Sequence, residues 1–193
     1  MRNAKSNMLH IIHLPDRTVR WTLLLRQPEH QGISDYKIWP GVKTARLSTG
    51  IAMAHQQIVK WAIRKNLPEI TIAEDDVLFT ANDAFTYYQQ NKPSTFDLYL
   101  GGITYGELMQ DNTVKDFAGT HLYTIHQNFY STFLDQNGEI DIDRALKNKG
   151  KFVVCNPMIA IQRNGFSDNR KKVMDYSIYF KGRSLYRGIE RTE

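Results

Sequence analysis

Short apolar runs alternate with segments of helical periodicity in the first half of the chain, and this alternation constrains the fold most. The runs predict strands at 8–14, 35–39, 69–73 and 96–100, and the periodic segments between them predict helices at 18–27, 48–65 and 81–91. Strands joined through a helix usually pair in parallel, because a parallel pair needs a long crossover connection. The sequence therefore predicts an α/β fold, with a single-domain, mostly parallel sheet flanked by helices.

The second half of the chain is less regular. It predicts strands at 121–125 and 151–155 and a helix at 127–134. Asp141 or Asp143 is expected to cap a further helix that Gly150 closes. No internal repeat, low-complexity tract or linker interrupts the sequence, so its 193 residues predict one domain.

Positive charge is concentrated near the C-terminus. The chain carries 25 Lys and Arg against 20 Asp and Glu, and residues 163–193 hold eight of these bases against four acids. Such a segment attracts anions, namely nucleic acid, an anionic membrane surface or the phosphates of a small ligand. Aromatic residues lie between the bases, as in nucleic-acid-binding segments, while a solvated chain end explains the same composition.

Cysteine usage and hydropathy exclude several classes of protein. Cys155 is the one cysteine, so the chain can form neither an internal disulfide nor a multi-cysteine zinc site. No apolar run approaches the roughly 18 residues that span a bilayer, and no signal peptide is recognisable at the N-terminus. We therefore expect a soluble, cytoplasmic protein, with a peripheral contact at the inner face of the membrane left open.

Three acids follow the predicted strand at 69–73. Glu74, Asp75 and Asp76 lie at its carboxyl end, where ligands bind in open α/β sheets. Alternate residues of an extended segment face the same side, so Glu74 and Asp76 are expected on one side and Asp75 on the other. Two such carboxylates suit Mn²⁺ or Mg²⁺, which complete their shells with water and substrate phosphates. An acidic turn that caps the next element is the alternative.

Other polar residues and glycines fall at comparable positions. Arg17 and Arg20 follow the first predicted strand, where they either reach the phosphates of a bound nucleotide or face solvent. His55 falls on the inner face of its helix, where it either meets a ligand or is a satisfied core histidine. Gly101 and Gly102 follow the fourth predicted strand and either allow close approach of a ligand or end the strand.

Six short segments of the chain form an ordered series. They are Leu14-x-x-Arg17-x-x-Arg20, Gly50 to His55, Ile70 to Asp76, Phe96 to Gly101, Gly119 to Tyr123, and a last group with Asp143 to Leu146, Pro157 to Gln162 and Ser167-Asp168. In this order they resemble glycosyltransferase family 25, the lipooligosaccharide-biosynthesis type of glycosyltransferase. The resemblance covers about Met8 to Asp168.

The resemblance implies a GT-A type, Rossmann-like domain over residues 1–168, with the basic tail 169–193 packing on or over its site. It implies transfer of a hexose, with inversion, from a nucleoside-diphosphate sugar such as a UDP-hexose to a hydroxyl of a glycan or lipid-linked glycan, as in lipopolysaccharide biosynthesis. It also implies Mn²⁺ or Mg²⁺ held by Asp76 and Glu74. The residues that it assigns to the donor are Leu14, Arg17, Arg20, His55, Glu74, Asp75, Gly101, Gly102, Gln162, Lys181 and Arg183.

Inverting transfer needs a carboxylate that takes the proton of the acceptor hydroxyl. Asp143, which matches the Asp-x-x-Leu position of the resembled family, is the first candidate, and Asp141 is the second. Both acids are equally well explained as N-cap residues of the helix that follows.

Two other functions are compatible with the sequence. A nucleotide-sugar-binding protein of the same fold would keep the donor site without turnover. A nucleic-acid-binding protein would use the basic tail, and as a nuclease it would reuse Glu74 and Asp76 for its metal. We expect the transferase, with no stable nucleic-acid partner.

Overall fold

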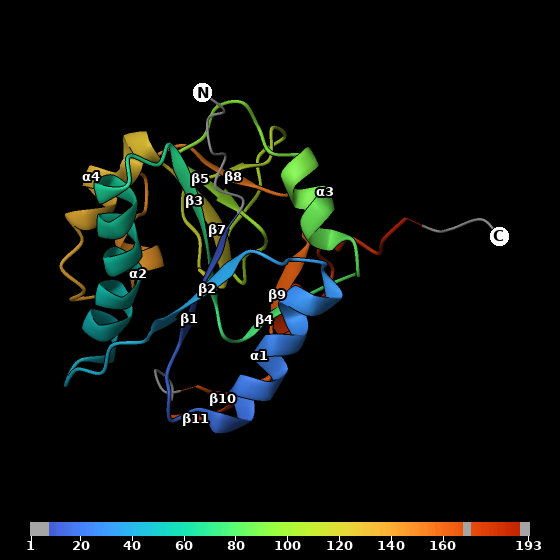
Figure 1. The fold of residues 1–193 in the computed structure, drawn as a ribbon. Coiled ribbons are helices and arrows are strands. Elements are labelled where there is room, and N and C mark those ends of the chain that lie inside the picture. Colours follow the sequence, from blue (N-terminus) through green and yellow to red (C-terminus); the bar gives the residue numbers. More distant parts are fainter. Residues whose placement is uncertain (1–7, 168–170, 190–193) are drawn as a thin grey trace.

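A seven-stranded sheet runs through the centre of the computed structural model (Figure 1), which describes residues 8–167 and 171–189. Its strands are β1 Leu9–His13, β2 Tyr36–Pro40, β3 Glu69–Glu74, β5 Leu98–Leu100, β6 Thr113–Val114, β7 Leu122–His126 and β8 Phe152–Val154, in the order β2-β1-β3-β7-β5-β8-β6. β2, β1, β3, β5 and β8 run in one direction, and β7 and β6 run against them. The predicted α/β fold with a mostly parallel sheet is confirmed.

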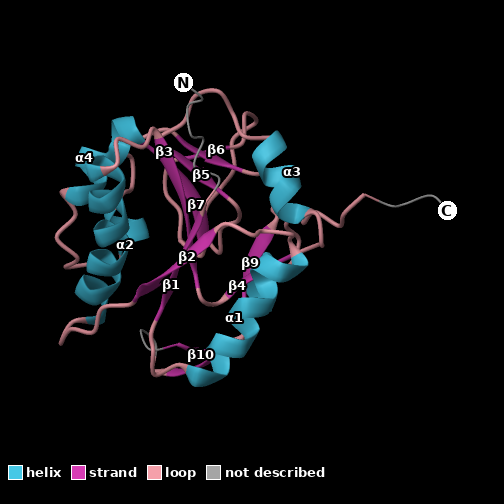
Figure 2. Cartoon of the chain, in the orientation of Figure 1, coloured by secondary structure: helices cyan, strands magenta, loops and turns pink. Residues whose placement is uncertain are grey.

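Helices cover both faces of this sheet (Figure 2). α2 Leu47–Arg64 and α4 Tyr130–Leu134 lie on one face, and α1 Thr18–His30 and α3 Ala84–Gln90 lie on the other. Each face has its own apolar cluster, which contains Ile58 and Phe133 on the α2 side and Leu24 and Tyr88 on the α1 side. Because the sheet is buried on both faces, its strands appear in the sequence as continuous apolar runs.

Shorter elements complete the fold. Two strand pairs lie outside the main sheet: β4 Val77–Phe79 pairs with β9 Ala160–Gln162, and β10 Gly165–Ser167 pairs with β11 Lys172–Met174. The short helices are the 3-10 turn η1 Gln127–Phe129, α5 Ile142–Ala145 and α6 Ser177–Phe180. β4 begins directly after the acidic segment, so its pairing with β9 brings a remote part of the chain to that segment.

The position of β7 beside β3 also brings remote residues to the acidic segment. β3 lies between β1 and β7, and its register sets Ile72 opposite Tyr123. The Glu74 N–H donates to the His121 carbonyl oxygen at 3.0 Å. The loop that leads into β7 therefore lies against the carboxyl end of β3.

The differences from the sequence-based expectations concern short or irregular segments. The pattern of the sequence does not predict β4, β6, β9, β10, β11 or α6, because two to four residues carry too little periodicity. α1 continues past its predicted end, through Pro28 to His30. The helix expected to close at Gly150 covers only the four residues of α5.

The C-terminal segment joins the body of the fold. The predicted division between residues 168 and 169 lies outside the described residues. Beyond it, β11 pairs with β10, Phe180 is buried in the cluster on the α2 side, and Tyr186 is buried in the cluster on the α1 side. Residues 171–189 therefore contribute to the core on both faces of the sheet.

Gly50 lies where the start of α2 meets the loop after β2, and a Cβ there would overlap the Val42 carbonyl oxygen. Helix propensity alone predicts that Gly50→Ala stabilises the fold by about 1 kcal/mol. Because the neighbour is backbone, we expect G50A instead to destabilise it by roughly 1–3 kcal/mol, measured as the free energy of unfolding in urea. Lys60→Ala, at an exposed position of α2, is the control. A G50A protein as stable as the wild type would contradict the close contact.

Candidate functional site

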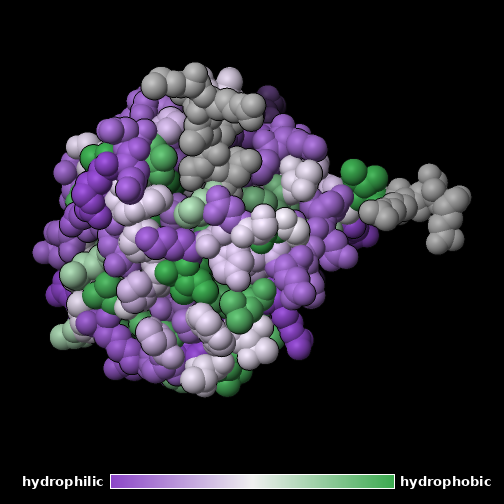
Figure 3. All heavy atoms as spheres, in the orientation of Figure 1, coloured by the Kyte–Doolittle hydropathy of each residue, from purple (hydrophilic) through white to green (hydrophobic). Residues whose placement is uncertain are grey.

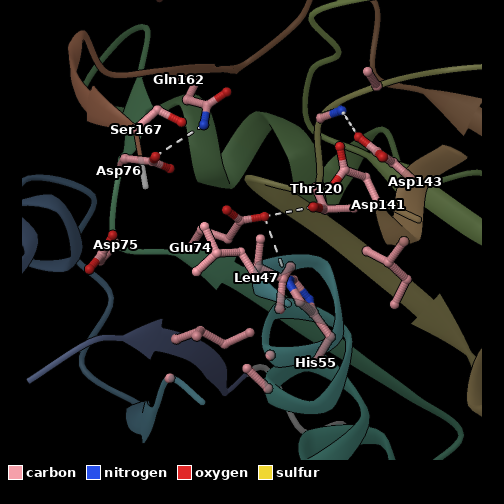
Figure 4. Close-up of a pocket in the computed structure, with 18 of the residues that line it drawn as sticks. Leu47, His55, Glu74, Asp75, Asp76, Thr120, Asp141, Asp143, Gln162 and Ser167 are labelled. Carbon is pink, nitrogen blue, oxygen red and sulfur yellow. Dashed lines mark hydrogen bonds and ion pairs between the residues drawn. The ribbon is translucent and has the colours of Figure 1, made fainter. Parts of the chain in front are cut away.

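A cavity of about 750 Å³ opens at the carboxyl ends of β1, β2 and β3 (Figure 4). One wall is apolar and consists of Ile12, Leu14, Val42, Leu47, Ile51 and Ala54. Acids and hydroxyl groups line much of the remainder, namely Glu74, Asp75, Asp76, Thr120, Asp141, Asp143, Ser167, Tyr176 and Tyr179. This is the edge at which open α/β sheets bind their ligands.

Two glycines allow the apolar wall to close. Gly41 follows β2 directly, and a Cβ there would come within 2.8 Å of the Leu14 side chain. Gly50 lets the start of α2 approach the same loop. The loop after β2 therefore packs closely against Leu14 and the start of α2, and Lys43 on this loop also lines the cavity.

Glu74 is held in place by neighbours from two other parts of the fold. Its Oε1 accepts a hydrogen bond from Thr120 Oγ1 at 2.6 Å, and His55 Nε2 lies 3.6 Å from the same oxygen. His55 Nδ1 in turn lies 2.8 Å from the Tyr123 hydroxyl oxygen. Burial raises the pKa of Glu74, but His55 and Thr120 outweigh burial and hold this pKa at about 2. Glu74 is therefore an ionised carboxylate of fixed orientation.

Asp75 points away from Glu74 (Figure 4) and forms a partly buried ion pair with Arg20. Its Oδ1 accepts a hydrogen bond from Arg20 Nη1 at 2.6 Å, and its Oδ2 lies 2.8 Å from His13 Nδ1. Arg20 also donates to Asp76 Oδ2 at 3.2 Å and to the Phe166 carbonyl oxygen at 2.8 Å. One guanidinium group thus links two neighbouring acids to the strand pair β10–β11.

Asp76 is the least satisfied of the three acids. Its Oδ2 accepts hydrogen bonds from Gln162 Nε2, at 3.0 Å, and from Arg20, whereas its Oδ1 is buried and has no hydrogen-bond partner among the described residues. Burial and the charge of Glu74 raise the pKa of Asp76 to about 7. A buried carboxylate with an unused oxygen favours a bound cation or a proton.

A divalent cation fits Asp76 alone better than it fits the predicted pair of Glu74 and Asp76. Glu74 Oε1 is already engaged by Thr120. Within residues 8–167 and 171–189, no group of three or more His, Cys, Asp or Glu side chains could hold a metal ion. Mg²⁺ needs only one or two carboxylates when water and phosphate oxygens supply its other ligands. The residues present therefore fit a cation that shares its coordination with a phosphate.

Asp141 and Asp143 lie across the cavity from Asp76, with Glu74 between them in the view of Figure 4. Asp143 Oδ2 accepts a hydrogen bond from the Gly119 N–H at 2.8 Å, and its Oδ1 accepts one from the N–H of the following residue at 2.7 Å. Burial raises the pKa of Asp143 despite these bonds, which suits a group that accepts a proton. Asp141 is the N-cap residue of α5, and Asp143 lies in its first turn.

Only some of the residues predicted to bind the nucleotide-sugar donor lie together in the structure. The members that line the cavity are Leu14, Arg20, His55, Glu74, Asp75 and Gln162. Gly101 and Gly102 are buried within the sheet, where an added Cβ would overlap neighbouring atoms. Lys181 is exposed at the end of α6, and Arg183 donates to a loop carbonyl oxygen. Arg17 lines a second, smaller cavity.

Sequence reasoning misses several residues that line the main cavity. Lys43 follows the strand-end pair Pro40-Gly41, so the rule that identified the acids would also have identified it. Arg144 and Tyr179 carry no comparable signal, because they reach the cavity only through the packing of α5 and α6.

Hydrophilic and hydrophobic residues both occur on the face of the molecule that Figure 3 shows. On the face in Figure 3, hydrophilic and hydrophobic residues alternate, with the hydrophobic ones most evident in its lower half. No helix in the described part of the chain has the length and apolar character needed to cross a membrane.

No family model matches the chain, and no curated protein matches its sequence. Solved structures do match it. A197 from STIV gives a TM-score of 0.54 at 12% identity, over 96% of this chain and 97% of that chain. The inositol-1-phosphate CTP transferase from T. maritima gives 0.54 at 10% identity, over 91% and 94%. HddC from Yersinia pseudotuberculosis, complexed with GMP-PN, gives 0.51 at 12% identity, over 90% and 96%.

These likenesses show the fold of the chain, which is that of Rossmann-like structures. One of the matched proteins is a CTP transferase by name, and another is complexed with GMP-PN. The resemblance to glycosyltransferase family 25 stays a prediction.

The raised pKa of Asp76 has a measurable effect on stability. The pKa of about 7 in the folded state lies above the ordinary value of 3.8, so the folded state binds the proton more tightly than the unfolded chain does. The contribution of Asp76 to stability therefore falls as the pH rises from about 4 to about 7. In EDTA we expect Asp76→Asn to exceed the wild type by roughly 1–3 kcal/mol at pH 8, and by much less at pH 4.5. Urea unfolding measures both values, and equal differences at the two pH values would refute the shift.

Proposed function

We propose that this protein transfers a hexose from a nucleoside-diphosphate sugar, such as a UDP-hexose, to a hydroxyl of a glycan or lipid-linked glycan, with inversion and with Mn²⁺ or Mg²⁺. The main support is one cavity that is lined both by an apolar wall and by a buried acid, Asp76, with an unused oxygen. A nucleotide sugar has matching parts, a flat base followed by a diphosphate that needs a cation. The cavity is also large enough for a ligand of this size. A place in family 25 and in lipopolysaccharide synthesis is part of the same proposal.

In this proposal the nucleobase of the donor occupies the apolar end of the cavity. Leu14 and Val42 follow β1 and β2, and Leu47 and Ile51 face them from the start of α2. Their side chains bury the faces of a planar ring and exclude water from it. Lys43 lies on the same loop, with its ammonium group paired with Asp16.

The diphosphate and the sugar lie along the acidic segment. Asp76 holds the cation, whose charge offsets the charge that develops on the departing diphosphate. Gln162 fixes the Asp76 carboxylate through its amide. Glu74, kept ionised and oriented by Thr120 and His55, accepts hydrogen bonds from hydroxyl groups of the sugar.

Asp143 is the general base of the proposed reaction. It takes the proton of the acceptor hydroxyl while that oxygen forms a bond to the anomeric carbon, and the bond from this carbon to the diphosphate breaks on the opposite side. This requires the base and the cation to lie on opposite sides of the sugar, and Asp143 and Asp76 lie on opposite sides of the cavity (Figure 4). Asp141, two residues earlier, is the alternative base.

The acceptor enters past tyrosine rings. Tyr105, Tyr176 and Tyr179 line the cavity, and Tyr105 and Tyr179 keep 54% and 41% of their surface exposed. The guanidinium group of Arg144 lies over the Tyr105 ring, 4.9 Å from its centroid. Such rings offer an apolar face and a polar edge, which suits a sugar acceptor.

Asp76→Asn should abolish metal-dependent donor binding while the protein stays folded. The amide cannot supply the anionic oxygen that a divalent cation needs. We expect UDP with Mn²⁺ to raise the melting temperature of the wild type and of the control Asp111→Asn, which alters an exposed acid outside the cavity, but not that of D76N. An undiminished shift in D76N would remove Asp76 from the donor site.

Asp143→Asn should lower turnover without a matching loss of donor affinity. An asparagine keeps the bond from Gly119 but cannot accept the acceptor proton. We expect kcat to fall by about a hundredfold or more, and the dissociation constant of UDP to change less than about threefold. Asp141→Asn is measured beside it. If D143N retains turnover and D141N loses it, Asp141 is the base.

The same samples test the other two functions. A protein that binds UDP-hexose but neither transfers nor hydrolyses it is a nucleotide-sugar-binding protein. A protein that binds oligonucleotide with an affinity that falls steeply with salt, and that UDP does not displace, acts on nucleic acid through its basic segment.

A further inference from the structure

A second cavity, of about 340 Å³, lies beside the main one. Residues 16–20, at the start of α1, line one part of it, and residues 163–166, from the end of β9 into β10, line another. Arg20 and Asp76 line both cavities. Their ion pair is therefore a wall that the two cavities share.

Guanidinium groups dominate the second cavity, because Arg17, Arg20 and Arg163 all line it. Its two acids are already engaged: Asp76 accepts hydrogen bonds from Arg20 and Gln162, and Asp16 pairs with Lys43. Arg20 is also paired, with Asp75 and Asp76, so the base that an anion in this cavity would chiefly meet is Arg163.

Arg163 is the least compensated of these bases. Its N–H donates to the Asp76 carbonyl oxygen at 2.8 Å, which fixes the backbone beside the shared wall. Its Nε is buried and has no hydrogen-bond partner among the described residues, and no salt bridge to it is found there. Burial lowers the pKa of Arg163, and of its charged neighbours Asp76 raises this pKa while Arg20 lowers it. A bound anion would offset the cost of burying the Arg163 charge. It would also reduce the repulsion between Arg163 and Arg20.

The N-terminus of α1 also favours an anion in this cavity. This helix has 13 residues and no acid in its first turn, and its N-cap residue Arg17 makes no side-chain cap bond within the described structure. Thr18 and Val19, which also line the cavity, begin the helix with backbone N–H groups that have no partner inside it. Such groups and the helix dipole favour a phosphate.

We infer that the second cavity is a phosphoryl-binding site, in which Arg163, Arg17 and the first N–H groups of α1 bind phosphate oxygens. The site lies outside the cavity proposed for the donor, and its existence does not depend on sugar transfer. The phosphoryl group has two sources: the diphosphate of the donor itself, reaching past Arg20, or a phosphate on the second substrate. Both present the same oxygens to the same guanidinium groups.

Inorganic phosphate, titrated at constant ionic strength in EDTA, tests the site. We expect it to bind the wild type and the control Arg26→Gln, which alters an exposed arginine farther along α1, with equal affinity. Arg163→Gln should bind it about tenfold more weakly, because a charged hydrogen-bond donor is lost, and Arg163→Lys should recover part of the loss. Unfolding curves establish that each variant is folded. No phosphate binding by the wild type, or equal binding by folded R163Q, would overturn the inference.

A second titration, with UDP and Mg²⁺ at saturation, identifies the source of the phosphoryl group. Unchanged phosphate affinity supports a site for a phosphorylated second substrate. Competition by UDP, together with weaker UDP binding in R163Q, supports a site for the donor diphosphate. If UDP does not bind at all, the transferase proposal fails, while the comparison of R163Q with R26Q still decides whether the phosphoryl site exists.

Discussion

Three consecutive carboxylates lie at the end of β3, with Glu74 partly buried and Asp75 and Asp76 buried, and the rest of the structure depends on how each is compensated. Burying an unpaired charge costs several kcal/mol, so every one of them needs a partner. Thr120 donates to Glu74, Arg20 pairs with Asp75, and Gln162 donates to Asp76. These partners come from the loop before β7, from α1 and from β9. The carboxylates therefore tie together elements that the sheet alone would not join.

These partners leave one oxygen of one carboxylate without a hydrogen bond in the described structure. Glu74 is kept ionised by His55 and Thr120, whereas Asp76, beside that fixed negative charge, has a pKa raised to about 7 and a buried oxygen without a partner in the described structure. Neighbouring acids with opposite pKa shifts are typical of functional sites. Asp76 is therefore the acid of the three that the described structure compensates least.

Arg20 connects this site to the second cavity. It holds Asp75 and Asp76 together and donates to the Phe166 carbonyl oxygen, so the strand pair β10–β11 is linked to the acidic segment through one guanidinium group. A cation that binds Asp76, or a phosphate that binds Arg20, would alter the charge balance of both cavities. The two cavities are therefore coupled electrostatically, whichever ligand occupies each.

By itself the sequence determined the α/β class, the strands that became β1, β3 and β5, and the placing of the acids at a strand end, because apolar periodicity and strand ends are local properties. It did not determine that β7 would lie antiparallel beside β3, or that Thr120, Gln162 and Arg163 would meet the acids. It also gave no indication that Arg20 would line the main cavity whereas Arg17 would line only the second one. These arrangements follow from strand pairing and packing between distant segments, and such contacts leave no pattern in any short stretch of sequence.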